Sequence, residues 1–380
     1  MPALLPDVDP DGLLEYSVVF TDRALNHMSR KFQGVMRDIA ATLTRVYSAR
    51  AAAVVPGSGT FGMEAVARQF ATGRKCLVIR NGWFSYRWSQ ILDVGNIAAQ
   101  SLVLKARPLG PGKHVAFAPP PVDEVVATIR EQKPDVVFAP HVETASGIIL
   151  PEPYVRAVAD AVHAAGGLFV LDCIASGAIW VDMAESGVDV LISAPQKGWS
   201  SSACGALVML SERGQAAMEQ TSSTSFACDL KKWFQIMDAY LAGGHAYFAT
   251  MPTDSLARLR DTMRETEAFG FDKARSAQRE LGERVRAMLA QHGFKSVAAR
   301  GFEAPGVVVC FTDDPEVQSG RKFIALGLQT AAGVPLQCDE PGDFQTFRVG
   351  LFGLDKLRDV EGAVRRLEQA VVALGTPPAR

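Results

Sequence analysis

The six cysteines of this 380-residue chain show no disulfide or metal-binding pattern. No two of them form a C-x-x-C pair, and most lie in apolar, strand-like runs, at positions 76, 173, 204, 228, 310 and 338. Cysteines that pair or bind zinc usually recur at short, regular spacings. We therefore predict reduced, buried thiols, no metal site and a cytoplasmic protein.

Membrane-spanning runs and an excess of basic charge are also missing. No apolar stretch reaches the ~18 residues of a transmembrane helix. The acidic N-terminus, MPALLPDVDPDG, lacks the basic and apolar segments of a signal peptide. The formal net charge is −2 at pH 7, whereas nucleic-acid-binding proteins carry a basic footprint. These features predict that neither a membrane nor a nucleic acid is a partner.

What remains is the composition of an ordinary globular enzyme, with 48% hydrophobic and 21% charged residues. The length allows two or more domains, each with its own core. Short apolar runs alternate with helix-period segments from about residue 50 to 210. This alternation predicts an α/β fold whose mainly parallel sheet is covered on both faces.

Periodicity also predicts the parts outside this core. One long helix is expected within 22–47. After Pro252 the pattern changes to helices at 253–268, 271–292, 316–326 and 354–374, with strands at 294–298, 306–311 and 346–350. We predict an N-terminal arm over 1–18, a large domain over 19–256 and a small C-terminal α+β domain over 257–380.

The most informative stretch runs from 168 to 210 and holds an acid and a lysine. Strands predicted at 168–171, 188–192 and 205–210 leave Asp172 and Lys197 in loops beside strand ends, where open α/β sheets carry their sites. A lysine amine can form a Schiff base with an aldehyde, and a carboxylate can keep a pyridine ring protonated. Taken alone, the same two residues would also suit a helix cap and a surface lysine.

A glycine-rich turn at 56–60, PGSGT, precedes a helix predicted over 61–70. Backbone N–H groups at a helix N-terminus lack partners and attract anions, and Ser58 and Thr60 add hydroxyl donors. The turn lacks the G-x-G-x-x-G spacing of a dinucleotide-binding fingerprint. By itself it suits either an anion site or an ordinary helix cap.

Together these segments resemble the class V aminotransferases, pyridoxal 5'-phosphate (PLP) enzymes of fold-type I such as alanine–glyoxylate and serine–pyruvate aminotransferases. The run LDCIASGAIWVDMAESGVDVLISAPQKGW is similar to the family's VD-S-x-A-S strand, G-[IV]-D segment and S-x-Q-K turn. GSGTFGMEA is similar to its phosphate-binding S-G-[TH] turn. The resemblance spans roughly residues 50–375. It implies that Lys197 and Asp172 are the catalytic residues: Lys197 holds PLP covalently, and Asp172 lies beside the pyridine nitrogen.

The resemblance implies further cofactor contacts. The segment NGWF is similar to the family's N-G-x-[FW], which makes Phe84 the residue stacked on the pyridine ring, with Trp83 as the alternative. HVETASG is similar to H-x-E-[ST]-x-[ST]-G, which puts Thr144 near the phenolic oxygen and leaves His141 as a loop residue. The full set of implied cofactor-binding residues is Ser58, Gly59, Thr60, Phe84, Thr144, Asp172, Ile174, Gln196, Lys197, Tyr247 and Thr250.

Substrate binding and assembly are implied in the same way. FRVGLFG is similar to the family's L-R-[IV]-[GS] strand, so Arg348 is expected to grip the substrate carboxylate with its planar fork. The Y-x-x-T-x-P pattern places Tyr247 and Thr250 at the partner's phosphate, which implies a homodimer with its sites at the interface. The implied reaction moves an amino group between an amino acid and a 2-oxo acid, with alanine, serine, glyoxylate and pyruvate expected.

The chain also departs from the family pattern. The G-P-G-P-[ST] segment that lines the substrate side is replaced by LLEYSVVFTDRALNHMS, which leaves the amino donor and acceptor open. One alternative is a cysteine desulfurase or lyase, because desulfurases carry a reactive cysteine before the arginine and Cys338 precedes Arg348. Asp339 and Glu340 follow Cys338, and nearby carboxylates would raise the thiol pKa, which favours the transaminase. A non-catalytic binder of the same fold is a further alternative, although the intact lysine and aspartate argue against it.

Overall fold

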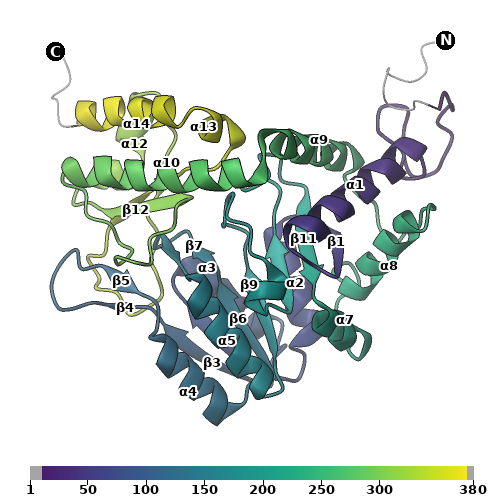
Figure 1. Cartoon of the computed structure of the whole chain (residues 1–380), viewed down its shortest axis with the longest axis horizontal. Helices are drawn as coiled ribbons and strands as arrows, with labels where there is room; N and C mark the ends of the chain where they lie inside the picture. The colour runs from purple at the N-terminus through teal and green to yellow at the C-terminus, as the bar shows by residue number, and fades with distance from the viewer. Residues whose placement is uncertain (1–10, 375–380) are drawn as a thin grey trace.

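The computed structural model describes residues 11–374 and contains a central seven-stranded sheet (Figure 1). Its strands in spatial order are β1 (Ala51–Pro56), β11 (Gly205–Leu210), β10 (Val190–Ser193), β9 (Leu168–Asp172), β6 (Val136–Pro140), β2 (Lys75–Arg80) and β3 (Gln100–Lys105). β11 is antiparallel to both of its neighbours, and all other neighbours are parallel. The inner strands are buried along their whole length, as expected of a sheet covered on both faces.

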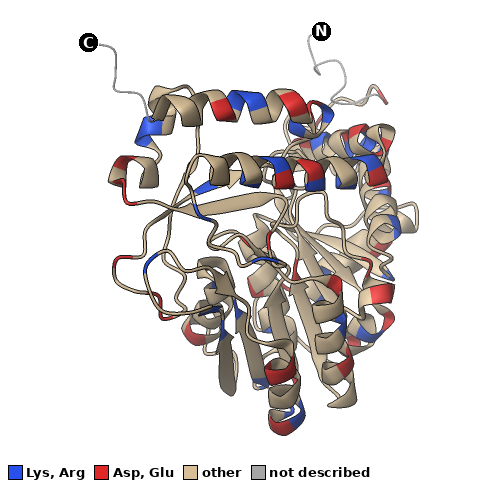
Figure 2. Ribbon diagram, turned by 60° about the vertical axis from the view of Figure 1, so that its left-hand side comes forward, with Lys and Arg blue, Asp and Glu red and all other residues tan. Residues whose placement is uncertain are grey.

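Helices pack around this sheet in two groups. The first group is α2 (Gly59–Phe70), which contacts β1, β10 and β11, and α3 (Trp83–Val94), which packs on α2 and contacts β2 and β6. The second group is α5 (Glu152–Ala164), which lies on β9, and α4 (Val122–Gln132), which packs on α5. The remaining helices of this part are α1 (Arg30–Val46), α6 (Met183–Ser186), α7 (Glu212–Glu219), α8 (Leu230–Leu241) and α9 (Thr253–Phe269). Charged residues concentrate on the helices, and the strands of the sheet carry few (Figure 2).

The C-terminal part is built on a second, three-stranded antiparallel sheet. Its order is β12 (Val307–Phe311), β14 (Thr346–Gly350) and β13 (Ala331–Ala332). The helices are α10 (Phe271–Gln291), α11 (Pro315–Gln318), α12 (Arg321–Ala325), α13 (Leu354–Arg358) and α14 (Val360–Leu374), and α10 and α14 pack on each other above β12 (Figure 1). Two small hairpins complete the described strands: β4 (Arg107–Pro108) with β5 (Phe117–Ala118), and β7 (Val142–Glu143) with β8 (Ile148–Ile149).

The predicted fold class is confirmed, and several predicted bounds differ for local reasons. The first helix begins only at Arg30, because the Ser29 hydroxyl caps it by accepting from Phe32 N. Residues 294–298 form single bridges to Phe117 and Cys310 instead of a strand. The predicted helix at 316–326 is two helices, and the one at 354–374 is interrupted at Asp359, whose carboxylate caps α14 by accepting from Gly362 N.

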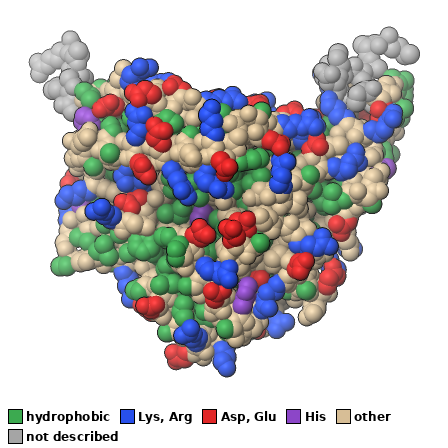
Figure 3. Space-filling view, viewed as in Figure 1, with side chains coloured by type: hydrophobic (Ala, Val, Ile, Leu, Met, Phe, Trp, Pro, Cys, Tyr) green, Lys and Arg blue, Asp and Glu red, His purple; other side chains and the backbone are tan. Residues whose placement is uncertain are grey.

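Two organisational predictions concern the ends and the domain boundary. Residues 11–18 of the predicted arm contain no helix or strand, and residues 1–10 lie outside the described range. The boundary near residue 256 stays a prediction; α9 packs on α1, whereas α10 packs on α14. Between residues 11 and 374, no helix is both long and apolar enough to cross a membrane. Acidic and basic side chains are intermingled on the face in Figure 3.

Candidate active site

Five loops that follow parallel strands meet at one edge of the central sheet. Ser58 follows β1, Asn81 follows β2, His141 follows β6, Asp172 ends β9 and Lys197 follows β10. Strands that run in the same direction bring their carboxyl ends to the same edge, where open α/β sheets bind ligands. The sheet order β1-β11-β10-β9-β6-β2 therefore gathers residues that are far apart in the sequence.

Asp172 and Lys197 shift each other's titration at this edge. Burial raises the pKa of Asp172 to about 7, and the charges of Lys197 and Arg87 oppose that rise. Burial also lowers the pKa of the Lys197 amine, and the positive charge of Arg348 lowers it further while Asp172 opposes. Each shift arises because the low-dielectric interior disfavours the charged form. Burial thus works against the charged form of both groups.

The turn before α2 is closely packed beneath the Asp172 loop. A Cβ atom on Gly59 would lie 2.7 Å from Ile174 Cδ1, and one on Gly62 would lie 2.3 Å from Ala206 Cβ. Ile174 N donates to Asp172 Oδ1 at 2.9 Å, so the same residue touches both the turn and the acid. Side chains larger than hydrogen would push the helix start away from the sheet, which explains the glycines.

Two arginines flank the Phe84 ring at the start of α3. The Arg87 guanidinium lies 4.8 Å and the Arg348 guanidinium 5.4 Å from the ring centroid. Arg87 Nη1 also donates to Thr60 Oγ1 at 3.2 Å, which links α3 to the start of α2. Arg348 lies on β14, between Val309 and Ala331 of the neighbouring strands, and donates through Nε to Ala332 O at 2.8 Å. The C-terminal sheet thereby contributes a cation to the edge of the central sheet.

Glu143 and His141 organise the loop after β6. The Glu143 carboxylate is fully buried and caps α3, accepting from Phe84 N, Ser85 N and the Ser85 hydroxyl, and it also accepts from Ala145 N. His141 Nδ1 lies 2.7 Å from Ser176 Oγ, and burial lowers the pKa of this histidine to about 4. A neutral, hydrogen-bonded histidine fits the predicted loop role. Thr144 is buried in the same turn.

Three predicted residues lie apart from this cluster or at its surface. Tyr247 is 54% exposed, and its hydroxyl lies 3.0 Å from Thr250 Oγ1. The Tyr247 ring packs 5.5 Å from that of His27, in the segment that replaces the missing glycine-rich motif. Gln196, next to Lys197, is exposed. Within one chain, the tyrosine and threonine contact each other, and their predicted role at a partner's site stays a prediction.

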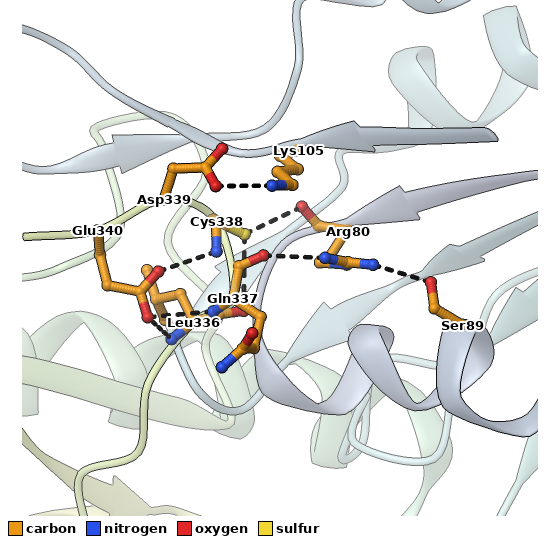
Figure 4. A network of polar contacts seen from close by, with 8 residues as sticks. All are labelled: Arg80, Ser89, Lys105, Leu336, Gln337, Cys338, Asp339 and Glu340. Atoms are coloured by element: carbon orange, nitrogen blue, oxygen red, sulfur yellow. Dashed lines mark hydrogen bonds and ion pairs between the residues drawn. The ribbon is translucent and has the colours of Figure 1, made fainter. Parts of the chain in front are cut away.

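Cys338 lies in a tightly bonded loop that contacts the central sheet (Figure 4). It is 3% exposed, and its Sγ lies 3.5 Å from Arg80 O. Burial, with the charges of Glu143 and Glu340, raises the thiol pKa to about 12. Of the two carboxylates that follow Cys338, Glu340 contributes to this rise, and Asp339 forms an ion pair with Lys105 at 2.7 Å. A protonated, enclosed thiol is unsuited to nucleophilic attack.

Two charged residues of the site were not predicted from the sequence. Arg87 follows Phe84 by nearly one helical turn, so the two side chains share a helix face. That spacing in NGWFSYRW was the available signal. Glu143 lies within HVETASG, and a buried acid before a turn gives no sequence signal until the helix that it caps is known.

The fold is shared with a known class of proteins. The architecture is that of fold-type I aminotransferases: the crystal structure of alanine–glyoxylate aminotransferase from Nostoc sp. is similar with a TM-score of 0.72. That likeness covers 91% of this chain and 88% of the Nostoc chain, at 20% sequence identity. It therefore supports the fold alone.

The family follows from the sequence comparison. The model of the family "Aminotransferase class-V" matches residues 13–325, so the chain belongs to the class V aminotransferases, which use PLP. The chain is 29% identical to 2-aminoethylphosphonate–pyruvate transaminase of Burkholderia ambifaria, over 84% of this chain and 81% of that protein. It is 26% identical to alanine–glyoxylate aminotransferase 1 of Saccharomyces cerevisiae, over 68% and 69%. The predicted family and enzyme class are confirmed.

Proposed function

We propose that this chain binds PLP at the sheet edge described above and transfers an amino group from a small amino donor to glyoxylate or pyruvate. The observation that carries the proposal is the buried Asp172 carboxylate near the partly buried Lys197 amine, with the Arg348 guanidinium close enough to affect the lysine pKa. A transaminase needs a lysine amine, an acid for the pyridine nitrogen and a cation for the substrate carboxylate. These three groups come from three different strands or loops.

The residues fit PLP chemically. The start of α2 has no acidic residue in its first turn, and Ser58 makes no side-chain cap bond, so N–H and hydroxyl donors there suit a phosphate. Asp172 is buried and forms no ion pair within residues 11–374, and a protonated pyridine nitrogen would supply the missing partner. Thr144, Ile174 and Gln196 belong to the loops around this pair and complete the proposed set.

The bound cofactor supplies an electron sink for the bond broken at the substrate α-carbon. Lys197 would hold the cofactor through its aldehyde, and its Nζ, whose pKa is lowered by burial, would serve as the base for the substrate α-proton. The Asp172 carboxylate would keep the pyridine nitrogen protonated. Phe84 supports the ring face, and Arg348 orients the substrate carboxylate.

A homodimer is part of this proposal. Tyr247 and the neighbouring Phe226 are 54% and 77% exposed, and Phe61 at the start of α2 is 51% exposed. Exposed aromatic side chains around a site often mark a protein interface. A second copy would cover them and bring Tyr247 and Thr250 to its partner's phosphate. A cytoplasmic location also belongs here, since all six cysteines are free and buried.

A panel of donors and acceptors tests the proposal. Alanine, serine and 2-aminoethylphosphonate should each be offered with glyoxylate and pyruvate, and cysteine should be offered with sulfide detection for the desulfurase alternative. We expect transfer from at least one donor to glyoxylate or pyruvate, and no sulfide. Lys197→Ala should abolish both transfer and the visible absorbance of the bound cofactor. Borohydride reduction should attach the cofactor permanently to Lys197. Attachment to a different lysine, or sulfide as the main product, would contradict the proposal.

A further inference from the structure

The Arg87 guanidinium is a further cation near Asp172 and Lys197, in addition to that of Arg348. It is half-buried, and no ion pair within residues 11–374 involves it. Its charge nevertheless affects both members of the central pair, because it lowers the pKa of Asp172 and of Lys197. An arginine that lies near Asp172 and Lys197 and has no carboxylate partner among the described residues is suited to an anionic ligand.

The position of Arg87 identifies which end of the site it faces. Nη1 donates to Thr60 Oγ1 at 3.2 Å, so the guanidinium lies at the start of α2, not on the C-terminal sheet with Arg348. Because the Thr60 oxygen accepts this bond, its own hydrogen is free to be donated elsewhere. The Phe84 ring, 4.8 Å from the guanidinium carbon, limits where the arginine can move.

The balance of charges around the site favours the binding of an anion. Arg87, Arg348 and Lys197 supply three basic groups, whereas the nearby acids are Asp172 and Glu143. Glu143 is already satisfied by four donors from the α3 start and the following turn. A substrate carboxylate would pair with Arg348. Arg87 would then be left to pair with an anion bound at the start of α2.

We infer that Arg87 binds the phosphate of the cofactor, together with the Thr60 hydroxyl and the N–H groups at the α2 N-terminus. This inference rests on the proposed binding of PLP. A guanidinium offers five N–H donors, of which Thr60 uses one, so two can face phosphate oxygens in its planar fork. Arg87 would thus be a cofactor-binding residue that also sets the position of the phosphate-binding turn.

The test compares PLP with pyridoxal, which has the same ring and aldehyde but no phosphate. Both are titrated into the cofactor-free protein, and binding is followed by absorbance and by tryptophan fluorescence. Arg87→Gln should weaken PLP binding roughly 10- to 100-fold and leave pyridoxal binding within about twofold. Arg87→Lys, which keeps the charge and loses the fork, should lie between. Arg348→Gln, beside the same ring, should not change the ratio of the two affinities.

The outcomes separate this inference from the proposed function. If wild type binds PLP more tightly than pyridoxal and Arg87→Gln keeps that ratio, the inference is wrong and the proposed function stands. An equal loss for both ligands would mean that Arg87 only supports the Phe84 ring or the fold. If Arg87→Gln leaves the ratio of PLP to pyridoxal affinity unchanged and instead lowers activity only with amino donors that bear a second acidic group, Arg87 binds the substrate and not the cofactor. If wild type binds neither ligand, the proposed function itself fails.

Discussion

Asp172 and Lys197 carry opposite pKa shifts with the same main cause, burial. The pKa of Asp172 is raised from 3.8 to about 7. Between these pH values the folded, cofactor-free protein holds a proton that the unfolded chain has released. The free energy of unfolding must therefore fall as pH rises through this range. A pyridine nitrogen beside the acid would remove this cost, because a positive partner restores the ionised form.

Asp172→Asn tests this linkage, since asparagine keeps an oxygen for Ile174 N and does not titrate. In the cofactor-free protein the variant should be more stable than wild type at pH 8, on the order of 2–4 kcal/mol. At pH 4.5 the gain should shrink to about 1 kcal/mol or less. Urea unfolding at the two pH values measures both differences. An equal gain in the free energy of unfolding at pH 4.5 and pH 8 would mean that Asp172 is ionised in the folded protein at both pH values.

Arg348 is expected to bind the substrate carboxylate, which gives a second prediction. Losing a charge-assisted, bidentate contact costs about 1.5–3 kcal/mol, or roughly 10- to 150-fold in kcat/KM. Arg348→Ala should show at least that loss with carboxylate donors and keep the cofactor absorbance. Arg348→Lys, with a point charge in place of the fork, should recover only part of it. An unaltered kcat/KM would place the substrate anchor elsewhere.

The element that decides between transamination and sulfur chemistry is the loop of residues 336–340. Its Leu336, Gln337 and Cys338 N–H groups all donate to the Glu340 carboxylate, while Arg80 Nη1 donates to Gln337 O (Figure 4). These bonds join the loop to the end of β2 and enclose the thiol. A mobile loop carrying a nucleophile would need the opposite arrangement, an exposed and easily ionised cysteine.

Cys338→Ala should therefore retain most transaminase activity, and wild type should release no sulfide or persulfide from cysteine. The cost in stability should be about 1–2 kcal/mol, because the thiol fills a buried position. A thiol reagent applied to the folded protein should react with Cys338 only after unfolding. If the variant loses its principal activity while its fold and cofactor absorbance persist, the desulfurase alternative takes first place.

Elements also show what the sequence could and could not predict. The inner strands and most helices were predictable because continuous apolar runs and helical periodicity persist over many residues. β3 was missed because its residues, QSLVLK, are exposed or half-buried at the sheet edge and give no buried-strand pattern. The break at Asp359 depends on a cap that periodicity cannot reveal.

The site follows the same division. The positions of Asp172, Lys197 and Ser58 at strand ends could be predicted, because each adjoins a short motif there; their roles stay predictions. The position of Arg87 could not be predicted, since it depends on how α2 and α3 pack, which brings the guanidinium to Thr60. Nor could a single sequence indicate that Tyr247 would be exposed beside His27. Contacts between elements depend on packing, which no local pattern records.

The position of Tyr247 and Thr250 makes the proposed homodimer testable. They bond to each other, and Tyr247 is 54% exposed, so they are available to a second copy. If each pair serves the partner's phosphate, a chain with a defective lysine and a chain with a defective pair fail at different places. One of the two sites in a mixed dimer would then combine intact residues from both chains.

Mixing Lys197→Ala with Tyr247→Phe/Thr250→Ala should restore activity above that of either parent. At random exchange, half of the dimers are mixed, each with one complete site, so about a quarter of the wild-type sites should be recovered. Native mass spectrometry of differently tagged chains must first show that subunits exchange, and a Lys197→Ala self-mixture sets the background. Verified exchange without restored activity would mean that Tyr247 and Thr250 serve their own chain's site or none. Restoration would instead require that each active site be built across the interface, because neither parent contains a complete one.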